Sequence, residues 1–304
     1  MTLSNRAARI SICAVLLSLS TASLSAQQPL LTAEPSRPAP GSLVLLTLDA
    51  RSASTDSVVA VTGSMSGEPL HFTRTALGTW RAIGPVSVDA TDSVPARVAA
   101  VKVSGAVDSV SVFVNLPKRP PAAAPSRRRQ LAVNPRFTRP MTAETQARID
   151  RENERAREIG RSAHSTEIMW TESFINPRPS SITSRFGSGR MFNGTLSSRH
   201  LGVDFSGAVG TPVRAANRGI VALVDEFFLA GNVVYVDHGG GVVTGYFHLS
   251  KALVAEGDSV ERGQQIGLVG ATGRVTGPHL HWNARYGAVT VNPLDLVSTA
   301  SRQR

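Results

Sequence analysis

Two short polar motifs with even spacing stand in the C-terminal part of this 304-residue chain. His279 and His281 are two residues apart, and His200 and Asp204 are four residues apart. Because side chains at even spacing lie on one face of a β-strand, we expect each motif to direct both of its polar side chains into a common site. Imidazole and carboxylate groups suit Zn²⁺, and three protein ligands plus a water are typical of a catalytic zinc site.

The first 26 residues have the features of a secretory signal peptide. Arg6 and Arg9 make a basic start, residues 10–19 form a short apolar run, and the small residues Ser25 and Ala26 follow. An uncleaved anchor is the less favoured alternative, because the run is shorter than the roughly 20 residues of a membrane span. No later stretch is apolar enough to cross a membrane. We therefore expect an exported protein of the periplasm or cell envelope, with release from the cell as an alternative.

Composition narrows the choice of partners. The only cysteine, Cys13, lies inside the expected signal peptide, so the exported chain has no thiol for a disulfide or a closed structural zinc site. The formal net charge of +10 favours anionic partners. Export makes the anionic surface of the cell envelope a better partner than nucleic acid, and we predict no nucleic-acid binding. Solubility alone explains the charge equally well.

Residues 27–117 predict a small β-sandwich of immunoglobulin-like type. Residues 42–48 form an apolar run, and the valines at 110, 112 and 114 alternate with other residues, as in a strand. Short strands separated by turn-forming residues are typical of such sandwiches. His71 stands alone in this part of the sequence, which indicates a structural or solvent-facing role.

Residues 118–141 read as a basic linker rich in proline, alanine and arginine, and residues 142–169 as a helical connector. Thr142 can cap a helix over 142–162, with Glu144 in its first turn. The few apolar positions of this helix, Ile149, Ala156 and Ile159, predict a connector that packs on one side only.

Residues 170–304 predict a mostly antiparallel β-sheet domain. Glycine-punctuated apolar runs at 219–224, 232–236, 241–248, 264–269 and 279–286 read as strands without a long helix between them. Five polar residues stand out in this domain and form a candidate metal site: His200, Asp204, His248, His279 and His281.

Residues 170–295 resemble the M23 metallopeptidases, the lysostaphin and LytM type of zinc endopeptidase that cuts cell-wall peptidoglycan. The resemblance rests on an ordered set of motifs: Ser184-Arg185-Phe186-Gly187, His200-x-x-x-Asp204, Gly210-Thr211-Pro212-Val213, Asp237-His238-Gly239, Tyr246-x-His248-Leu249 and Gly277-Pro278-His279-Leu280-His281. A His-x-His pair alone is common, but this order over the whole domain is specific.

The resemblance implies a role for each polar residue. His200, Asp204 and His281 would hold one Zn²⁺ per chain, and His248 and His279 would be catalytic, in an order that the sequence leaves open. In the family an upstream asparagine can occupy a fourth position in a latent form, and Asn193 lies in a suitable stretch. Tyr246 and Trp282 are expected to face away from the site and pack.

The resemblance implies a zinc-dependent endopeptidase that cuts the peptide cross-links of peptidoglycan. The main alternative is a LytM-type regulator that has lost zinc and activates cell-wall amidases; such proteins lack several of the five polar residues, whereas this chain retains all five. A third possibility is an envelope-assembly adaptor that makes its contacts through the β-sandwich. The N-terminal domain is a candidate regulator of access to the site.

Overall fold

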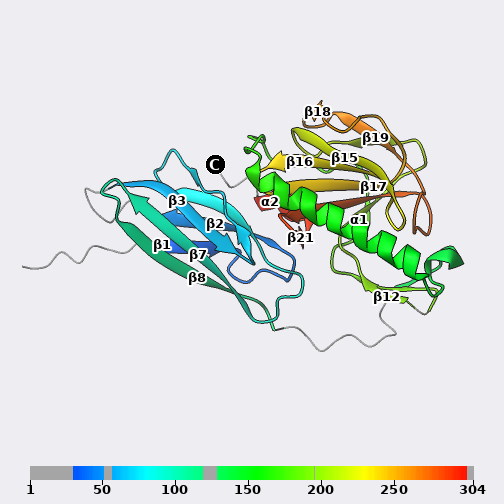
Figure 1. Cartoon of the computed structure of the whole chain (residues 1–304), viewed down its shortest axis with the longest axis horizontal. Coiled ribbons are helices and arrows are strands. Elements are labelled where there is room, and N and C mark those ends of the chain that lie inside the picture. Colours follow the sequence, from blue (N-terminus) through cyan, green and yellow to red (C-terminus); the bar gives the residue numbers. More distant parts are fainter. Residues whose placement is uncertain (1–29, 51–56, 119–128, 195, 300–304) are drawn as a thin grey trace, which may run out of the picture.

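A computed structural model describes residues 30–50, 57–118, 129–194 and 196–299. The expected signal peptide and residues 119–128 of the expected linker lie outside these residues. The chain is mostly β, with an N-terminal pair of sheets, one long helix and a large C-terminal sheet, as the sequence predicts (Figure 1). The boundaries expected for the individual domains stay predictions.

Two four-stranded sheets make up the N-terminal part. The first has the order β1 (Leu30–Glu34), β2 (Leu43–Asp49), β6 (Trp80–Pro85) and β5 (Thr73–Arg74). The second has the order β4 (Glu68–Pro69), β3 (Val58–Met65), β7 (Ser93–Lys102) and β8 (Val107–Asn115). Apolar side chains from both sheets share one buried core, because each strand directs alternate residues inwards.

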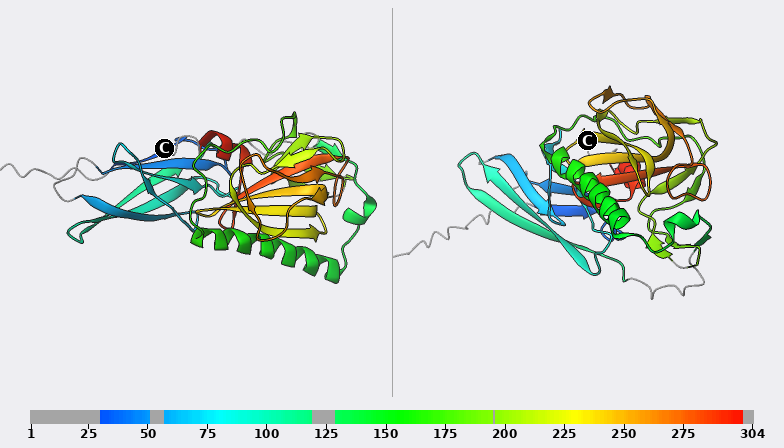
Figure 2. Two further views of the ribbon diagram at one scale, coloured as in Figure 1. Left: turned by 90° about the horizontal axis from the view of Figure 1, so that it is seen from above. Right: turned by 45° about the vertical axis from the view of Figure 1, so that its right-hand side comes forward.

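The long helix α1 (Ala143–Ser162) begins where the sequence predicts. The Thr142 side chain caps it by accepting a hydrogen bond from the backbone N–H of Thr145. Its buried residues are Ile149, Ala156 and Gly160, so one side of the helix packs and the charged remainder faces solvent. Figure 2 shows α1 lying along the C-terminal sheet, where Ala156 joins a core cluster with residues of that sheet.

The C-terminal sheet has ten strands, and all its pairings are antiparallel. Its main path runs β10 (Ile182–Ser184), β13 (Val203–Ser206), β20 (His279–Tyr286), β17 (Val242–Ala252), β16 (Gly231–Gly239), β15 (Gly219–Phe227) and β18 (Ser259–Val260). Three strands attach beside this path: β14 (Pro212–Arg214), β19 (Gln265–Val269) and β21 (Val289–Val291). The antiparallel sheet predicted for this domain is therefore confirmed.

Smaller elements complete the described part of the chain. A three-stranded sheet has the order β12 (Leu196–Arg199), β11 (Gly189–Phe192) and β9 (Arg129–Leu131), and β9 runs parallel to β11. The short helices are η2 (Pro135–Phe137), η3 (Ala163–Ser165) and α2 (Pro293–Thr299). Within the described residues, no helix has the length and apolar character needed to cross a bilayer.

Candidate metal and catalytic site

Strands β13 and β20 bring three of the five predicted polar residues onto one face of the sheet. Asp204 on β13 pairs with His281 on β20, and Ser206 pairs with His279. Because directly opposite residues of an antiparallel pair share a face, this register places Asp204, His279 and His281 together. The even spacing of His279 and His281 therefore has the structural consequence expected from the sequence.

His200 reaches the site in a different way from the one predicted. It precedes β13 in an irregular segment, so the expectation that His200 and Asp204 share one strand is wrong. The ring is fixed by its Nδ1 atom, which lies 3.0 Å from the Arg185 carbonyl oxygen and 3.1 Å from Ser184 Oγ. A carbonyl oxygen can only accept, so Nδ1 carries the proton and Nε2 presents a lone pair to the site.

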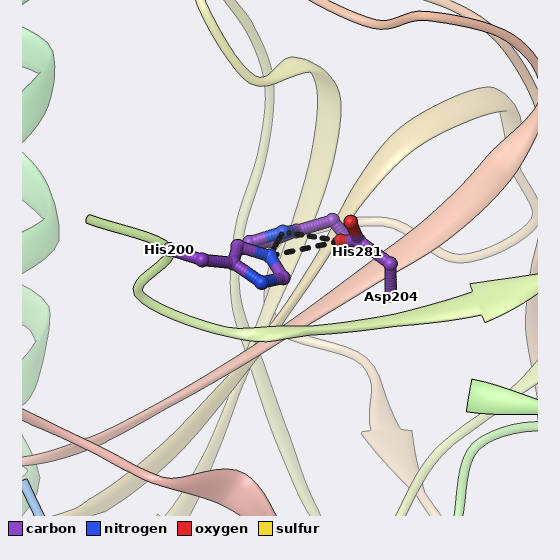
Figure 3. Close-up of side chains that lie close together, drawn as sticks. All are labelled: His200, Asp204 and His281. Atoms are coloured by element: carbon purple, nitrogen blue, oxygen red, sulfur yellow. Dashed lines mark hydrogen bonds and ion pairs between the residues drawn. The ribbon is translucent and has the colours of Figure 1, made fainter. Parts of the chain in front are cut away.

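The Nε2 atom of His200 meets Asp204 and His281 in a tight cluster (Figure 3). It lies 2.9 Å from His281 Nδ1 and 3.0 Å from Asp204 Oδ1, and the latter two atoms are 2.9 Å apart. The His200 side chain is only 1% exposed and that of Asp204 8%. Buried lone pairs that face one point repel one another unless a cation lies between them. The donor set and its orientation thus fit a bound metal ion.

His248 and His279 form a second pair of imidazoles beside this cluster. Their ring centroids are 5.0 Å apart, and His279 Nε2 lies 3.7 Å from Asp204 Oδ1. Each ring donates its Nδ1 proton to a backbone carbonyl, His248 to Thr272 at 2.9 Å and His279 to Gly277 at 2.8 Å. Both Nε2 atoms are therefore left as acceptors, which is the protonation state that a general base needs.

An irregular backbone brings His248 to the site. On β17, Phe247 pairs with His281 and Tyr246 pairs with Trp282, and both Tyr246 and Trp282 are fully buried in the core. Strict alternation would turn His248 to the same side as Tyr246. Instead, His248 has a left-handed φ of 62°, next to a register shift in the strand, and its ring packs against those of His279 and His281.

Burial and mutual interactions decide the charge of the site. Burial lowers the pKa of His281 to about 4. Burial, followed by the charges of His279 and His281, holds the pKa of His248 well below its ordinary value. Burial alone would raise the pKa of Asp204, but its interactions with His200 and His281 outweigh this effect and keep it far below the usual range. At neutral pH His248 and His281 are thus neutral imidazoles and Asp204 is a carboxylate.

Two clefts of about 240 and 250 Å³ are lined by residues of the cluster. The first is bordered by Asp204 and His279, the second by His200, His248 and His281. Both clefts are also lined by three residues that the sequence reasoning did not single out: Arg190, Phe192 and Arg274. Their positions in the sequence follow no pattern of spacing with the histidines, so only the folded chain reveals them.

Asn193 lies away from the metal-ligand cluster. Its Oδ1 accepts from the Val133 N–H at 2.9 Å, and its Nδ2 donates to the Val133 carbonyl at 3.0 Å and to Thr138 Oγ1. These bonds fasten the chain after β9 to the end of β11. In this conformation Asn193 is a structural residue.

The fold and the site define the class of protein: a mostly β protein with a His, Asp and His metal site on an antiparallel sheet. Comparison with known proteins identifies the family. The family model described as "Peptidase family M23" matches residues 198–293. The catalytic domain of lysostaphin from Staphylococcus simulans is 31% identical, with 39% of this chain and 92% of that chain covered at a TM-score of 0.36. The chain belongs to peptidase family M23.

Two further relatives extend the comparison. An M23 peptidase structure from Pseudomonas aeruginosa is 25% identical and covers 86% of this chain and 95% of that chain, with a TM-score of 0.64. The peptidoglycan DD-endopeptidase ShyA of Vibrio cholerae is 52% identical over 83 residues, which is 27% of this chain. The chain matches only 19% of the length of that relative, so the match concerns the segment that carries the site.

Proposed function

We propose that this chain is a zinc-dependent endopeptidase that cuts the peptide cross-links of peptidoglycan in the cell envelope. The observation that carries the proposal is the convergence of the lone pairs of His200, Asp204 and His281 beside two further imidazoles with free Nε2 atoms. Two neutral nitrogens and one carboxylate are a ligand set that suits Zn²⁺. The DD-endopeptidase activity of the relative ShyA supports the choice of substrate.

The residues divide the chemistry between holding a metal and moving protons. When bound, zinc polarises the scissile carbonyl and lowers the pKa of a coordinated water to about 7. His200, Asp204 and His281 would hold the ion. His248 and His279 would take the proton of the attacking water and deliver a proton to the leaving amine, because their Nε2 acceptors lie next to the cluster.

The carbonyls of Thr272 and Gly277 keep these two rings in the tautomer that can accept a proton. Burial keeps His248 neutral until a proton is transferred to it.

Digestion of purified sacculi tests the proposal. The purified protein and its His281→Ala variant are incubated with sacculi, and the released muropeptides are identified by mass spectrometry. We expect cross-linked dimers to decrease and monomers to increase with the wild type only. Metal content, measured by mass spectrometry of the purified proteins, should be about one zinc per chain for the wild type and much lower for the variant.

The alternative function as a regulator of cell-wall amidases predicts a different result. In that case the sacculi would remain cross-linked with both proteins, and digestion would begin only when an amidase is added. The complete set of five polar residues in one place argues for the endopeptidase, because a regulator has no need of two proton-transfer groups beside a metal site.

A further inference from the structure

Two arginines from separate segments flank the metal-ligand cluster. Arg190, on β11, donates from Nη2 to the Oδ2 atom of Asp204, the oxygen that does not face the two histidines. Arg274 comes from the connection between β19 and β20, and its guanidinium lies 4.3 Å from the centroid of the Phe192 ring. Both arginines line the two clefts, so they stand where the clefts meet.

The charge of this region is incompletely balanced by the protein. Arg190 faces Asp204, but that carboxylate already interacts with His200 and His281. Among the residues that the structure describes, no carboxylate lies within ion-pair distance of the Arg274 guanidinium. Burial, followed by the charge of Arg190, lowers the pKa of Arg274 to about 10, so Arg274 remains cationic at neutral pH. A bound metal ion would add further positive charge.

The cleft beside Asp204 has the size and lining for a small anion attached to a peptide. Besides the two arginines it is lined by the polar residues Thr183, Ser206 and Thr276, and it borders His279. A guanidinium offers parallel N–H donors that match the two oxygens of a carboxylate. Half-burial strengthens such a pair, because less water competes for it.

We propose that Arg274, with Arg190 beside it, forms an anion subsite for the free carboxylate of the substrate residue that supplies the scissile nitrogen. This inference rests on the proposed function. In a D,D cross-link that carboxylate is bonded to the same carbon as the scissile nitrogen, so it must lie within a few bonds of the reacting atoms. Within the described residues, Arg190 and Arg274 are the arginines that line both clefts, whereas Arg199 and Arg285 line only the second.

Paired substrates test the subsite. A purified cross-linked muropeptide dimer is compared with the same dimer in which that carboxylate is converted to a carboxamide. We expect the wild type to have the higher kcat/KM for the acid. Arg274→Gln should reduce the ratio of acid to amide by roughly 10- to 100-fold, since hydrogen bonds to charged groups are strong. Arg262→Gln is the matched control, because Arg262 is paired with Glu172 and lines neither cleft.

Arg274 is a better test position than Arg190, whose replacement would also disturb Asp204. Circular dichroism and zinc content should be the same for Arg274→Gln and the wild type. An unchanged acid-to-amide ratio in Arg274→Gln, with both properties intact, would overturn the subsite.

A binding measurement separates this inference from the proposed function. Isothermal titration of the protein with acetyl-D-alanyl-D-alanine and with its carboxamide requires no turnover. We expect the acid to bind more tightly than the amide, and Arg274→Gln to lose most of this difference while Arg262→Gln keeps it. If sacculi are not digested and the acid is still preferred, the proposed activity fails and the subsite stands. Equal binding of acid and amide by all three proteins would contradict the subsite and leave the proposed activity unaffected.

Discussion

At the scale of single residues, His248 combines an unfavourable backbone with a position beside the metal-ligand cluster. Left-handed φ values are uncommon for residues other than glycine and cost on the order of 1–3 kcal/mol where the surrounding structure imposes them. At His248 the value of 62° turns the ring towards His279 and His281. The strain thus has a geometric consequence that regular strand backbone would not provide.

Two replacements of His248 separate the backbone requirement from the imidazole. His248→Asn should fold with near-normal stability, because asparagine tolerates this conformation, whereas His248→Val should be less stable by about 1–2 kcal/mol. Urea denaturation measures the difference. Both variants should lose the proposed endopeptidase activity and retain the metal ion, because His200, Asp204 and His281 are untouched. Equal stability of the two variants would contradict the interpretation of the backbone.

His238 is a second residue whose protonation is governed by burial. It is fully buried, its Nδ1 donates to the Arg218 carbonyl at 2.7 Å, and its Nε2 lies 2.8 Å from Thr244 Oγ1. Burial lowers its pKa to about 4. A proton added to the ring would leave a charge in the core without a counter-ion, so His238 serves structure in its neutral form.

The stability that depends on neutral His238 should fall in acid. Because its pKa is lower in the folded than in the unfolded protein, the unfolded chain binds more protons between about pH 6.5 and 4. The stabilisation is therefore present above pH 6.5 and is lost as the pH falls through this window, by at most about 1.4 kcal/mol per pH unit. The wild type should have a higher free energy of unfolding than His238→Gln at pH 7, and this difference should become smaller as the pH falls to 4.5. Urea denaturation across this pH range measures the difference in the free energy of unfolding. A difference that does not change with pH would show that His238 does not titrate in this way.

At the scale of elements, helix α1 is joined to the sheet at a position where there is no room for a side chain. Gly160 is buried near the end of α1, and a Cβ atom there would overlap the carbonyl oxygen of Gly287, between β20 and β21. The close approach allows the end of α1 to reach the strand that carries His279 and His281. The helix therefore packs on the face of the sheet that carries the site, where Asn153 and Ala156 line the second cleft.

Gly160→Ala is a test in which two effects oppose each other. Alanine favours a helix over glycine by about 1 kcal/mol, but overpacking of a close contact costs typically 1–3 kcal/mol. Since the overlap is with backbone, we expect a net loss of about 1–2 kcal/mol in the free energy of unfolding, measured with urea. Arg151→Ala, at an exposed position of the same helix, should change stability by less than about 0.5 kcal/mol. A more stable Gly160→Ala protein would show that the contact is loose.

At the scale of the whole molecule, a buried polar cluster joins the N-terminal sheets to the rest of the chain. Glu68 accepts from the Ala288 N–H at 3.0 Å and lies 2.9 Å from His164 Nε2, while His164 Nδ1 lies 2.9 Å from His71 Nε2. His71 therefore has partners, although it stands alone in the sequence. Leu43 of the N-terminal sheets also belongs to the core cluster of the C-terminal sheet, and the two parts lie side by side in Figure 2.

Removal of the Glu68 carboxylate should weaken the whole protein. In Glu68→Ala the N–H groups of Ala288 and His164 lose their acceptor, and a buried unsatisfied donor costs about 1–3 kcal/mol. Calorimetry of the wild type should show one transition, because the shared core couples the two parts, and the variant should unfold in one transition at lower temperature. Asp92→Ala, at an exposed position, is the control. Two separate transitions in the wild type would contradict this coupling.

Local features of the fold follow from the sequence because they depend on neighbouring residues. Thr142 and the apolar positions of α1 predict the helix start and its buried side, and the structure confirms both. The bounds expected for the last strand with two histidines agree with β20. Even spacing puts His279 and His281 on one face because alternation is a property of extended backbone. The order of motifs indicates the M23 family on its own.

Tertiary structure decided what no local pattern encodes. His200 enters from an irregular segment, and His248 reaches the cluster through a left-handed residue, whereas strand periodicity describes regular backbone only. Arg190 and Arg274 meet at the clefts because β11 and the β19–β20 connection pack together, and Glu68, His71 and His164 meet because two sheets and a helix do. Sequence by itself determined which residue types are available, where α1 begins, and the bounds of the strand that carries His279 and His281. Long-range packing determined which of those residues become neighbours, because it brings together segments that local backbone geometry does not connect.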